Sequence, residues 1–399
     1  MTRRLGAVAA AALLCVVAAC SSDSSADSSA DGQRSAAATT GDSDSRTDQS
    51  GGADEPDAAQ GDTSDGGVPT ARWDDADLLE PETALLDWKT HQLRDKGPAA
   101  ATRSWTGVAD ALGKRVVITG PGKTLRFQAA TGRVQGLEMQ WPWAVVYAGG
   151  SLTGGRAQSQ QGEIAVFDLR DGTRRMVGDE GSAPPPAMAG SVSMHDGELA
   201  YATGSNRHYC LAKLDLASLD GKRLRCAEPL KEGFTQFRLT STGFGYTSFD
   251  DRQPSSCMTL KTIRDDENDV IEAAKNCVGW EVVPGPDSDL WLQVRNPNRV
   301  EQARAYARTS DGEVRNLGPA MSGSTTWCDG STYFVRPAQA DGRADDLMRW
   351  SPESGLDVVW TPQGKDVAFV FAPHCGGSTI TIPGFDRDQD PMILSAPTS

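Results

Sequence analysis

The sequence predicts an all-β fold built from a repeated unit of four strands, and three observations predict it. Short apolar segments recur from about residue 103 to the C-terminus, each ending at a glycine or a proline. A second series of turns follows at the same interval, and the segments before these turns alternate between apolar and polar residues. Alternation with a period of two is typical of strands, and turns at a fixed interval indicate a structural repeat.

The first turn of each unit is expected to join its first two strands. These turns recur about every 44 residues and centre on Gly113, Pro142, Gly197, Gly243, Pro286, Gly330 and Gly377. Seven units are therefore predicted. The seventh unit is short, because only 22 residues follow its first turn and they hold no fourth strand.

The second turn of each unit is expected to join its third and fourth strands. Asp-Gly between alternating segments is a strong hairpin signal, since glycine tolerates the positive φ that these turns need. At intervals of 40 to 49 residues the sequence has Thr131-Gly132, Asp171-Gly172, Asp220-Gly221, Asp266-Glu267-Asn268, Asp311-Gly312 and Ser354-Gly355. Third strands are expected before them, as in Leu125–Gln128, Gly162–Leu169, Leu211–Leu216 and Leu347–Trp350.

Four strands recurring every 40 to 50 residues are typical of a β-propeller blade, so residues 103–399 are predicted to form a seven-bladed β-propeller. Segments such as Val166-Phe-Asp-Leu169 before Asp171-Gly172 resemble the blades of quinoprotein-like and YVTN-like propellers. That resemblance covers roughly residues 103–399 and implies the propeller fold. A β-sandwich of repeated hairpins is the alternative.

Residues 1–19 are expected to be a signal peptide. Arg3 and Arg4 precede an apolar stretch of 15 residues, which is too short to span a bilayer. The stretch ends in Val17-Ala18-Ala19-Cys20, which resembles the lipobox of bacterial lipoproteins. The resemblance implies that Cys20 carries acyl chains such as palmitate and anchors the protein to the outer face of the cytoplasmic membrane. The alternative is an ordinary cleaved signal with a chance cysteine.

Residues 20–70 are predicted to be a disordered tether. From residue 21 on, Ser, Asp, Gly, Ala and Thr supply 41 of the 50 residues, and the segment has a net charge of −9. Such a segment cannot bury enough apolar surface to offset its chain entropy. Much of the net charge of −15 therefore belongs to the tether. A chain this acidic repels phosphate, so we expect no nucleic acid as a partner.

Residues 71–102 are expected to hold the strand that closes the ring. Propellers avoid an exposed edge by borrowing a strand from the other terminus, and the seventh unit lacks its fourth strand. Thr83–Lys89 is the candidate, although a short helix starting at Pro81 fits the same residues.

Six cysteines remain after the signal and the anchor, and an even count in an exported chain predicts disulfides. The repeat register pairs residues that flank one hairpin or precede equivalent turns, which gives Cys210–Cys226, Cys257–Cys277 and Cys328–Cys375. Metal binding by Cys375 beside His374 is the alternative. The sequence has no Cys-x-x-Cys and only four scattered histidines, so we expect neither a metal nor a cofactor.

The longest connections of the predicted propeller join second to third strands, and all of these emerge on one face. Long loops on a rigid scaffold are where binding function concentrates. Arginine pairs with carboxylate or phosphate, so an anionic wall polymer or an acidic patch of a cell-envelope protein would fit this face. The candidate residues are Arg156, Arg207, Arg252, Arg295, Arg299, Arg336 and Arg343.

The function expected from the sequence is a ligand- or protein-binding platform, monomeric and held at the outer face of the cytoplasmic membrane. The alternative is an extracytoplasmic propeller enzyme, a glycoside hydrolase or a lyase with carboxylates in its channel. The sequence contains no paired-carboxylate motif, and no catalytic residue is assigned.

The lipobox yields a direct prediction about Cys20. Metabolic labelling with a clickable fatty acid should tag the wild-type protein but not Cys20→Ala, because the thiol is the acylation site. The variant should also appear in the medium, since it has lost its anchor. Equal labelling of both proteins would show that Cys20 is not acylated.

Overall fold

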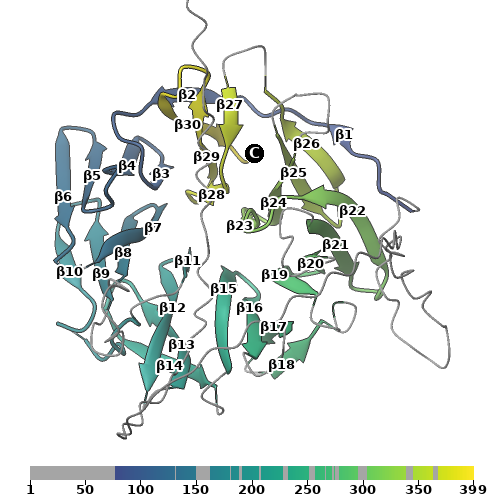
Figure 1. Ribbon diagram of the computed structural model, residues 1–399, viewed down its shortest axis with the longest axis horizontal. Coiled ribbons are helices and arrows are strands. Elements are labelled where there is room, and N and C mark those ends of the chain that lie inside the picture. Colours follow the sequence, from purple (N-terminus) through teal and green to yellow (C-terminus); the bar gives the residue numbers. More distant parts are fainter. Residues whose placement is uncertain are drawn as a thin grey trace, which may run out of the picture. The chain divides into compact units, whose positions relative to one another are not determined.

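Seven β-sheets stand around a central channel in the computed structural model (Figure 1). The structure describes residues 77–399 with the exception of 131, 150–161, 180, 188–190, 206–207, 228–231, 251–256, 266, 272–273, 275–277, 295–302, 338–344 and 363–366. They belong to one compact unit, Thr63–Ser399. In this part of the chain no helix has the length and apolar character to cross a membrane.

Each sheet is one blade, and its strands run outward from the channel in chain order. Blade 1 consists of β3 (Ala99–Thr102), β4 (Trp105–Ala109), β5 (Arg115–Gly120) and β6 (Lys123–Gln128). Blade 2 consists of β7 (Arg133–Gln140), β8 (Trp143–Gly149), β9 (Glu163–Asp168) and β10 (Arg174–Met176). Blade 3 consists of β11 (Val192–His195), β12 (Glu198–Ser205), β13 (His208–Asp215) and β14 (Gly221–Cys226).

Blades 4 to 6 follow the same order. Blade 4 consists of β15 (Glu232–Thr240), β16 (Gly243–Asp250), β17 (Cys257–Arg264) and β18 (Glu267–Val270). Blade 5 consists of β19 (Gly279–Pro284), β20 (Ser288–Val294), β21 (Ala303–Thr309) and β22 (Val314–Ala320). Blade 6 consists of β23 (Thr326–Cys328), β24 (Ser331–Arg336), β25 (Asp346–Ser351) and β26 (Gly355–Trp360), with β1 (Glu82–Thr83) parallel to β26 at its outer edge.

Blade 7 is assembled from both ends of the described chain. Its inner strands β27 (Val367–Val370) and β28 (His374–Cys375) both pair with β29 (Thr379–Asp386), and β30 (Pro391–Pro397) follows. The outermost strand is β2 (Lys89–Gln92), which pairs antiparallel with β30 (Figure 1). This pairing closes the ring.

The middle strands of a blade lie in the core, and the outermost strand does not. All seven residues of β8 are buried, because a middle strand is covered on both faces by the neighbouring blades. In β6 most residues are exposed and only Phe127 is buried. The core therefore fills the spaces between adjacent blades, as in the cluster that Trp105, Leu137 and Phe167 form with their neighbours.

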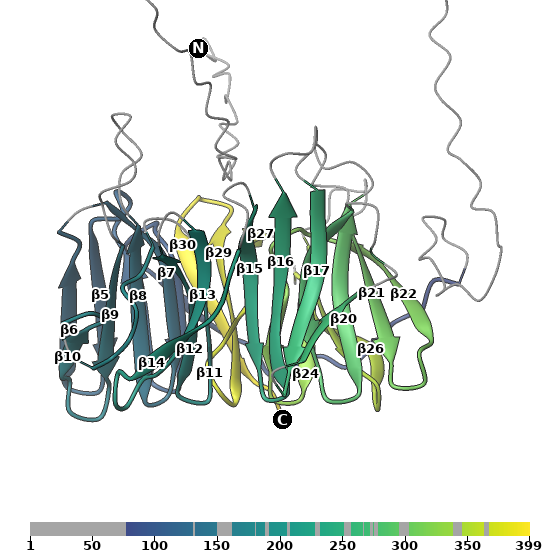
Figure 2. The ribbon, with the colours of Figure 1, turned by 90° about the horizontal axis from the view of Figure 1, so that it is seen from below.

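The two faces of the propeller differ in the connections that they carry. Strands within each blade alternate in direction, so the second-to-third connections and the connections between blades share one face (Figure 2). We refer to it as the loop face. The opposite face, the turn face, carries the first turn and the third-to-fourth turn of each blade, such as Asp171-Gly172 in blade 2.

An N-terminal belt, residues 78–93, runs along the outer edges of three blades. Leu78 forms a parallel bridge with Asn316 of blade 5, and β1 then pairs with blade 6. The belt continues with a backbone hydrogen bond of 3.0 Å from Leu86 to Val359 and ends with β2 on blade 7. Backbone pairing with three sheets covers edges that would otherwise be open.

The junction of blades 7, 1 and 2 depends on small residues. The inner strand of blade 1 reads Ala-Ala-Ala-Thr, so it leaves room for the turn of blade 7. A Cβ at Gly376 would lie 2.7 Å from the carbonyl oxygen of Ala101, which only glycine permits. The hydroxyl of Thr102 donates to the carbonyl of Gly376 (2.7 Å) and accepts the N–H of Trp141 (3.1 Å), so one side chain joins three blades.

The seven blades predicted from the repeats are present, but the first unit was in the wrong register. Gly113 lies between β4 and β5, the second and third strands, and Leu125–Gln128 belongs to the outermost strand β6. The true first strand, Ala99–Thr102, has no large apolar side chain, and its turn at Arg103 has no glycine although φ is +49°. Both signals on which the register relied are missing there.

The closing strand lies within residues 71–102, as the short seventh unit suggested, but it is Lys89–Gln92. Of the expected segment Thr83–Lys89, only the last residue belongs to that strand. Thr83 pairs with blade 6 instead, and residues from Pro81 onward form no helix.

Two of the three predicted disulfides are confirmed. Cys210–Cys226 links paired positions of β13 and β14, and Cys328–Cys375 links the inner strands of blades 6 and 7. The pair Cys257–Cys277 stays a prediction, because Cys277 lies outside the described residues.

The two disulfides should differ in what they contribute to stability. In the chain-entropy model, the loop of 47 residues closed by Cys328–Cys375 is worth about 4 kcal/mol, and the loop of 16 closed by Cys210–Cys226 about 3 kcal/mol. We expect Cys328→Ala/Cys375→Ala to lower the denaturation midpoint more than Cys210→Ala/Cys226→Ala. Equal midpoints for the two double variants would contradict the larger contribution to stability expected of Cys328–Cys375.

Candidate functional site

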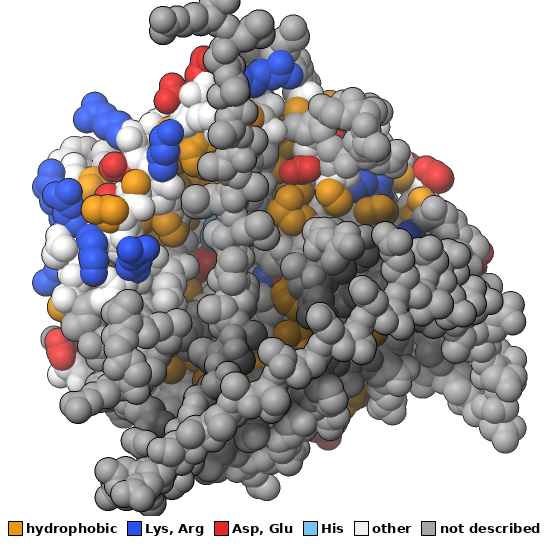
Figure 3. All heavy atoms as spheres, viewed as in Figure 1, with side chains coloured by type: hydrophobic (Ala, Val, Ile, Leu, Met, Phe, Trp, Pro, Cys, Tyr) orange, Lys and Arg blue, Asp and Glu red, His pale blue; other side chains and the backbone are white. Residues whose placement is uncertain are grey.

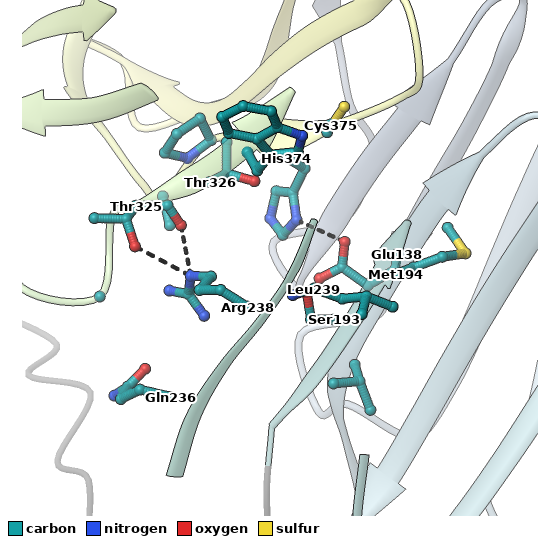
Figure 4. Close-up of a pocket in the computed structure, with 15 residues that line it drawn as sticks. Glu138, Ser193, Met194, Gln236, Arg238, Leu239, Thr325, Thr326, His374 and Cys375 are labelled. Atoms are coloured by element: carbon teal, nitrogen blue, oxygen red, sulfur yellow. Dashed lines mark hydrogen bonds and ion pairs between the residues drawn. The ribbon is translucent and has the colours of Figure 1, made fainter. Parts of the chain in front are cut away.

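The central channel contains a cavity of about 220 Å³. First strands from blades 2, 3, 4, 6 and 7 reach its wall, so residues far apart in the sequence meet there (Figure 4). We call this cavity the channel pocket. Its charged and polar side chains include Glu138, Ser193, Gln236, Arg238 and His374.

Bulges in the inner strands precede two charged residues of the pocket wall and a third, Glu281, that is buried behind it. In β15, Gln236 and Phe237 lie opposite Tyr246 alone, and Gln236 has a φ of +53°. Similar shifts of register occur in β7 before Glu138 and in β19 before Glu281. A bulge re-aims the side chains that follow it, and bulges are frequent beside functional sites.

Arg238 and Glu281 form a buried ion pair at the wall of the pocket. The Glu281 side chain is 0% exposed, and its carboxylate accepts hydrogen bonds from Arg238 (2.6 Å), the hydroxyl of Thr325 (2.7 Å) and the backbone N–H of Gly323 (2.6 Å). Buried charges need such partners, because desolvation is costly. The network joins blades 4 and 5 to the segment that enters blade 6.

The same network fixes the guanidinium of Arg238. Its Nε donates to the carbonyl oxygen of Thr325 (2.8 Å), and one terminal nitrogen donates to the carbonyl oxygen of Phe237 (2.8 Å). With the bond to Glu281, these contacts use three of the five N–H groups of the side chain. Arg238 is therefore held rigidly at the pocket wall, with N–H groups to spare among the contacts that the structure describes.

Glu138 and His374 form a second pair of ionisable side chains at the pocket. Glu138 is on β7 and His374 on β28, and Glu138 Oε2 lies 3.5 Å from His374 Nδ1 (Figure 4). The two strands belong to blades 2 and 7, and they approach each other past the alanine strand of blade 1. Both side chains stay partly exposed, at 20% and 25%. This carboxylate is therefore accessible, unlike that of Glu281.

Serine hydroxyls hold the inner strands of blades 3 and 4 together beside the pocket. Ser193 accepts the backbone N–H of Leu239 (2.8 Å), and Ser191 accepts that of Phe237 (3.2 Å). Because the hydroxyl of Ser193 acts as an acceptor here, its own hydrogen can be donated to a ligand.

Of the seven arginines predicted for the loop face, six lie outside the described residues: Arg156, Arg207, Arg252, Arg295, Arg299 and Arg343. The seventh, Arg336, donates to the carbonyl oxygen of Leu317 (3.0 Å) at the contact of blades 5 and 6. Burial lowers the pKa of Arg336, while the nearby carboxylates Asp346 and Glu80 act in the opposite direction. Arg336 is thus committed to packing between two blades.

On the described part of the loop face, Lys and Arg side chains gather over blade 1 (Figure 3). The β4–β5 turn contributes two of the cations on this side. Arg115 is paired with Asp110 at 3.3 Å, and Lys114 donates to the carbonyl oxygen of Gly132 (2.5 Å). Both cations therefore already have anionic or carbonyl partners on the protein.

Sequence reasoning missed the channel residues, although the repeat contained a signal for them. Glu138, Ser193 and Thr326 each lie four positions before the predicted first turn of their unit, and Arg238 and Glu281 lie five positions before theirs. Four of these five residues line the channel pocket, and the fifth, Glu281, binds Arg238 behind its wall, so polar residues in an otherwise apolar first strand were the signal. Among the described residues, no group of His, Cys, Asp or Glu could hold a metal ion.

Comparisons with known proteins support the fold. No protein-family model and no curated sequence matches this chain. The β-propeller domain of the Trilobed protease from Pyrococcus furiosus aligns over 80% of this chain and 97% of that one, with a TM-score of 0.50 and 9% identity. The chain is a seven-bladed β-propeller.

Two further solved structures align with most of this chain, at lower TM-scores. Acylaminoacyl peptidase from Pyrococcus horikoshii aligns over 76% of this chain, with a TM-score of 0.49 and 9% identity, and this chain spans only 52% of it. An oligogalacturonate lyase in complex with manganese aligns over 78% of this chain and 82% of that one, at 13% identity and a TM-score of 0.43.

The buried ion pair can be tested by double mutation. Arg238→Met should lower the free energy of unfolding by about 3–5 kcal/mol, because it leaves the Glu281 carboxylate buried without its charged partner. Arg238→Met/Glu281→Leu should recover most of that loss. Urea denaturation measures both, and Arg115→Met, at an exposed pair, is the control that should change little. A double variant as unstable as the single one would mean that the pair does more than compensate charge.

Proposed function

We propose that this protein is a lipid-anchored, extracytoplasmic binding protein whose propeller takes a ligand or partner from its loop face and channel. The lipobox at Cys20 and the acidic tether of residues 20–70 support the anchor and the location. The seven-bladed propeller supports the role of a platform, because its connections of variable length stand on a rigid ring.

The observation that carries the proposal is that only one of the two carboxylates at the pocket, Glu138 and Glu281, is accessible to a ligand. Hydrolysis of a glycosidic bond usually needs two carboxylic groups, one as acid and one as nucleophile or base. Both oxygens of Glu281 are already bonded, and its side chain is fully buried. Within the described lining of the pocket this leaves Glu138 as the accessible carboxylate. A preorganised Arg238 and one accessible carboxylate in the same pocket suit recognition better than hydrolysis.

The alternative function is that of a hydrolase or lyase. It would rely on Glu138 together with His374, the one pair of titratable groups in the pocket wall whose members are both partly exposed. Loss of turnover of a wall polysaccharide in Glu138→Gln would favour this alternative.

The proposed partners of the binding function are a cell-envelope protein or a wall polymer, bound by one copy of the chain.

The binding proposal predicts where the protein contacts other molecules in cells. A photoreactive residue placed at Gln236, in the channel pocket, or at Leu112, which is 68% exposed in the β4–β5 turn, should capture an envelope component. The same residue placed at Asp171 or Glu353, in turns of the opposite face, should capture little. Mass spectrometry of crosslinked intact cells provides the measurement. Capture from the turn-face positions alone would refute the assignment of the binding side.

A further inference from the structure

We infer that the channel pocket binds a small zwitterion, a free amino acid or a short peptide, with its carboxylate on Arg238 and its ammonium group on Glu138. The inference rests on the proposed binding function and gives its site a ligand class. It follows from the two unlike charges of the pocket wall, from their different states of compensation and from the size of the cavity.

The carboxylate end is matched by Arg238. Three of its N–H groups are occupied by Glu281, Thr325 and Phe237, so the two that remain belong to its terminal nitrogens. Terminal N–H groups of arginine form the fork that a carboxylate accepts with both oxygens. The bonds to the protein fix the guanidinium before any ligand arrives, which reduces the entropy lost on binding.

The ammonium end is matched by Glu138. Its contact with His374 is long, at 3.5 Å, and involves Oε2, so the other carboxylate oxygen can accept a hydrogen bond from a ligand. Both side chains line the pocket, Glu138 from blade 2 and Arg238 from blade 4 (Figure 4). A ligand with a positive group at one end and a negative group at the other can therefore reach both.

Charge balance and hydrogen bonding disfavour ligands of a single sign. The charge of Arg238 is compensated by Glu281, so a purely anionic ligand would enter a pocket whose remaining charge is that of Glu138. A purely cationic ligand would leave the spare N–H groups of Arg238 without an acceptor in a desolvated site, which is unfavourable. A zwitterion satisfies both groups at once.

The size of the pocket agrees with a small ligand. Pockets for drug-sized molecules measure ~300–1,000 Å³, and the channel pocket has about 220 Å³. An amino acid or a dipeptide with small side chains fits this volume. The apolar residues of the wall, Val192, Met194 and Leu239, would contact aliphatic side chains of the ligand.

The test is calorimetric titration of the full-length protein in detergent with L-alanine, dialanine and trialanine. We expect one of the three to bind best, since the two charged groups of the wall fix the span. N-acetylation of that ligand removes the ammonium group and C-amidation removes the carboxylate. Each change should weaken binding tenfold or more, because each removes a charge-assisted hydrogen bond.

A matched pair of variants assigns the ammonium site. Glu138→Gln should weaken binding of the zwitterion tenfold or more but leave that of its N-acetyl derivative unchanged. Glu198→Gln changes an exposed carboxylate of blade 3 and should bind as the wild type does. Glu138 is partly exposed and, within the described part of the chain, its carboxylate contacts His374 alone, so unchanged thermal unfolding would show that the variant is folded.

Three outcomes would overturn the inference, and they separate it from the proposed function. Equal binding of the acetylated, amidated and zwitterionic forms would show that the end groups are not recognised. Binding of glucuronate instead would give the pocket another ligand class and leave the binding function standing. Absence of any binding, together with no capture from Gln236 or Leu112 in cells, would remove both.

Discussion

The pairing of β2 with β30 is the interaction on which the rest of the structure depends. Seven blades leave two free edges unless the ring closes, and here the outermost strand of the last blade comes from the N-terminal side of the first. Residues 78–93 extend this closure along blades 5 and 6 before they reach blade 7. The disulfide Cys328–Cys375 adds a covalent link between the inner strands of blades 6 and 7, where β28 has only two residues.

Closure also determines the geometry of the channel. Small side chains in β3 and the turn at Gly376 let blades 7 and 2 approach each other across blade 1, and the hydroxyl of Thr102 connects all three. The contact between Glu138 and His374 exists only because of this approach. Residues that stabilise the ring and residues that give the pocket its polar groups are therefore adjacent, as Cys375 and His374 are on β28.

The chemistry of the pocket follows from which charges are already compensated. Glu281 is buried and saturated with hydrogen bonds, so it serves to fix Arg238 rather than to react. Glu138 is partly exposed and only loosely paired. One fixed cation and one accessible anion in a cavity of about 220 Å³ make a site that recognises charge separation. Bulges before each of these residues show that the strands deviate from regular pairing at these positions.

The sequence by itself determined the class of fold, the number of blades and two disulfides, because strand alternation, turn glycines and cysteine register are local or periodic signals. It did not determine the register of blade 1, since Ala99–Thr102 carries no side chain large enough to show a pattern. The tertiary structure alone decided the pocket. Glu138, Arg238, Glu281 and His374 come from four blades, and each was an isolated polar residue until ring closure brought the inner strands around one axis. Arg238 is paired with Glu281, 43 residues away in the chain, and Glu138 contacts His374, 236 residues away.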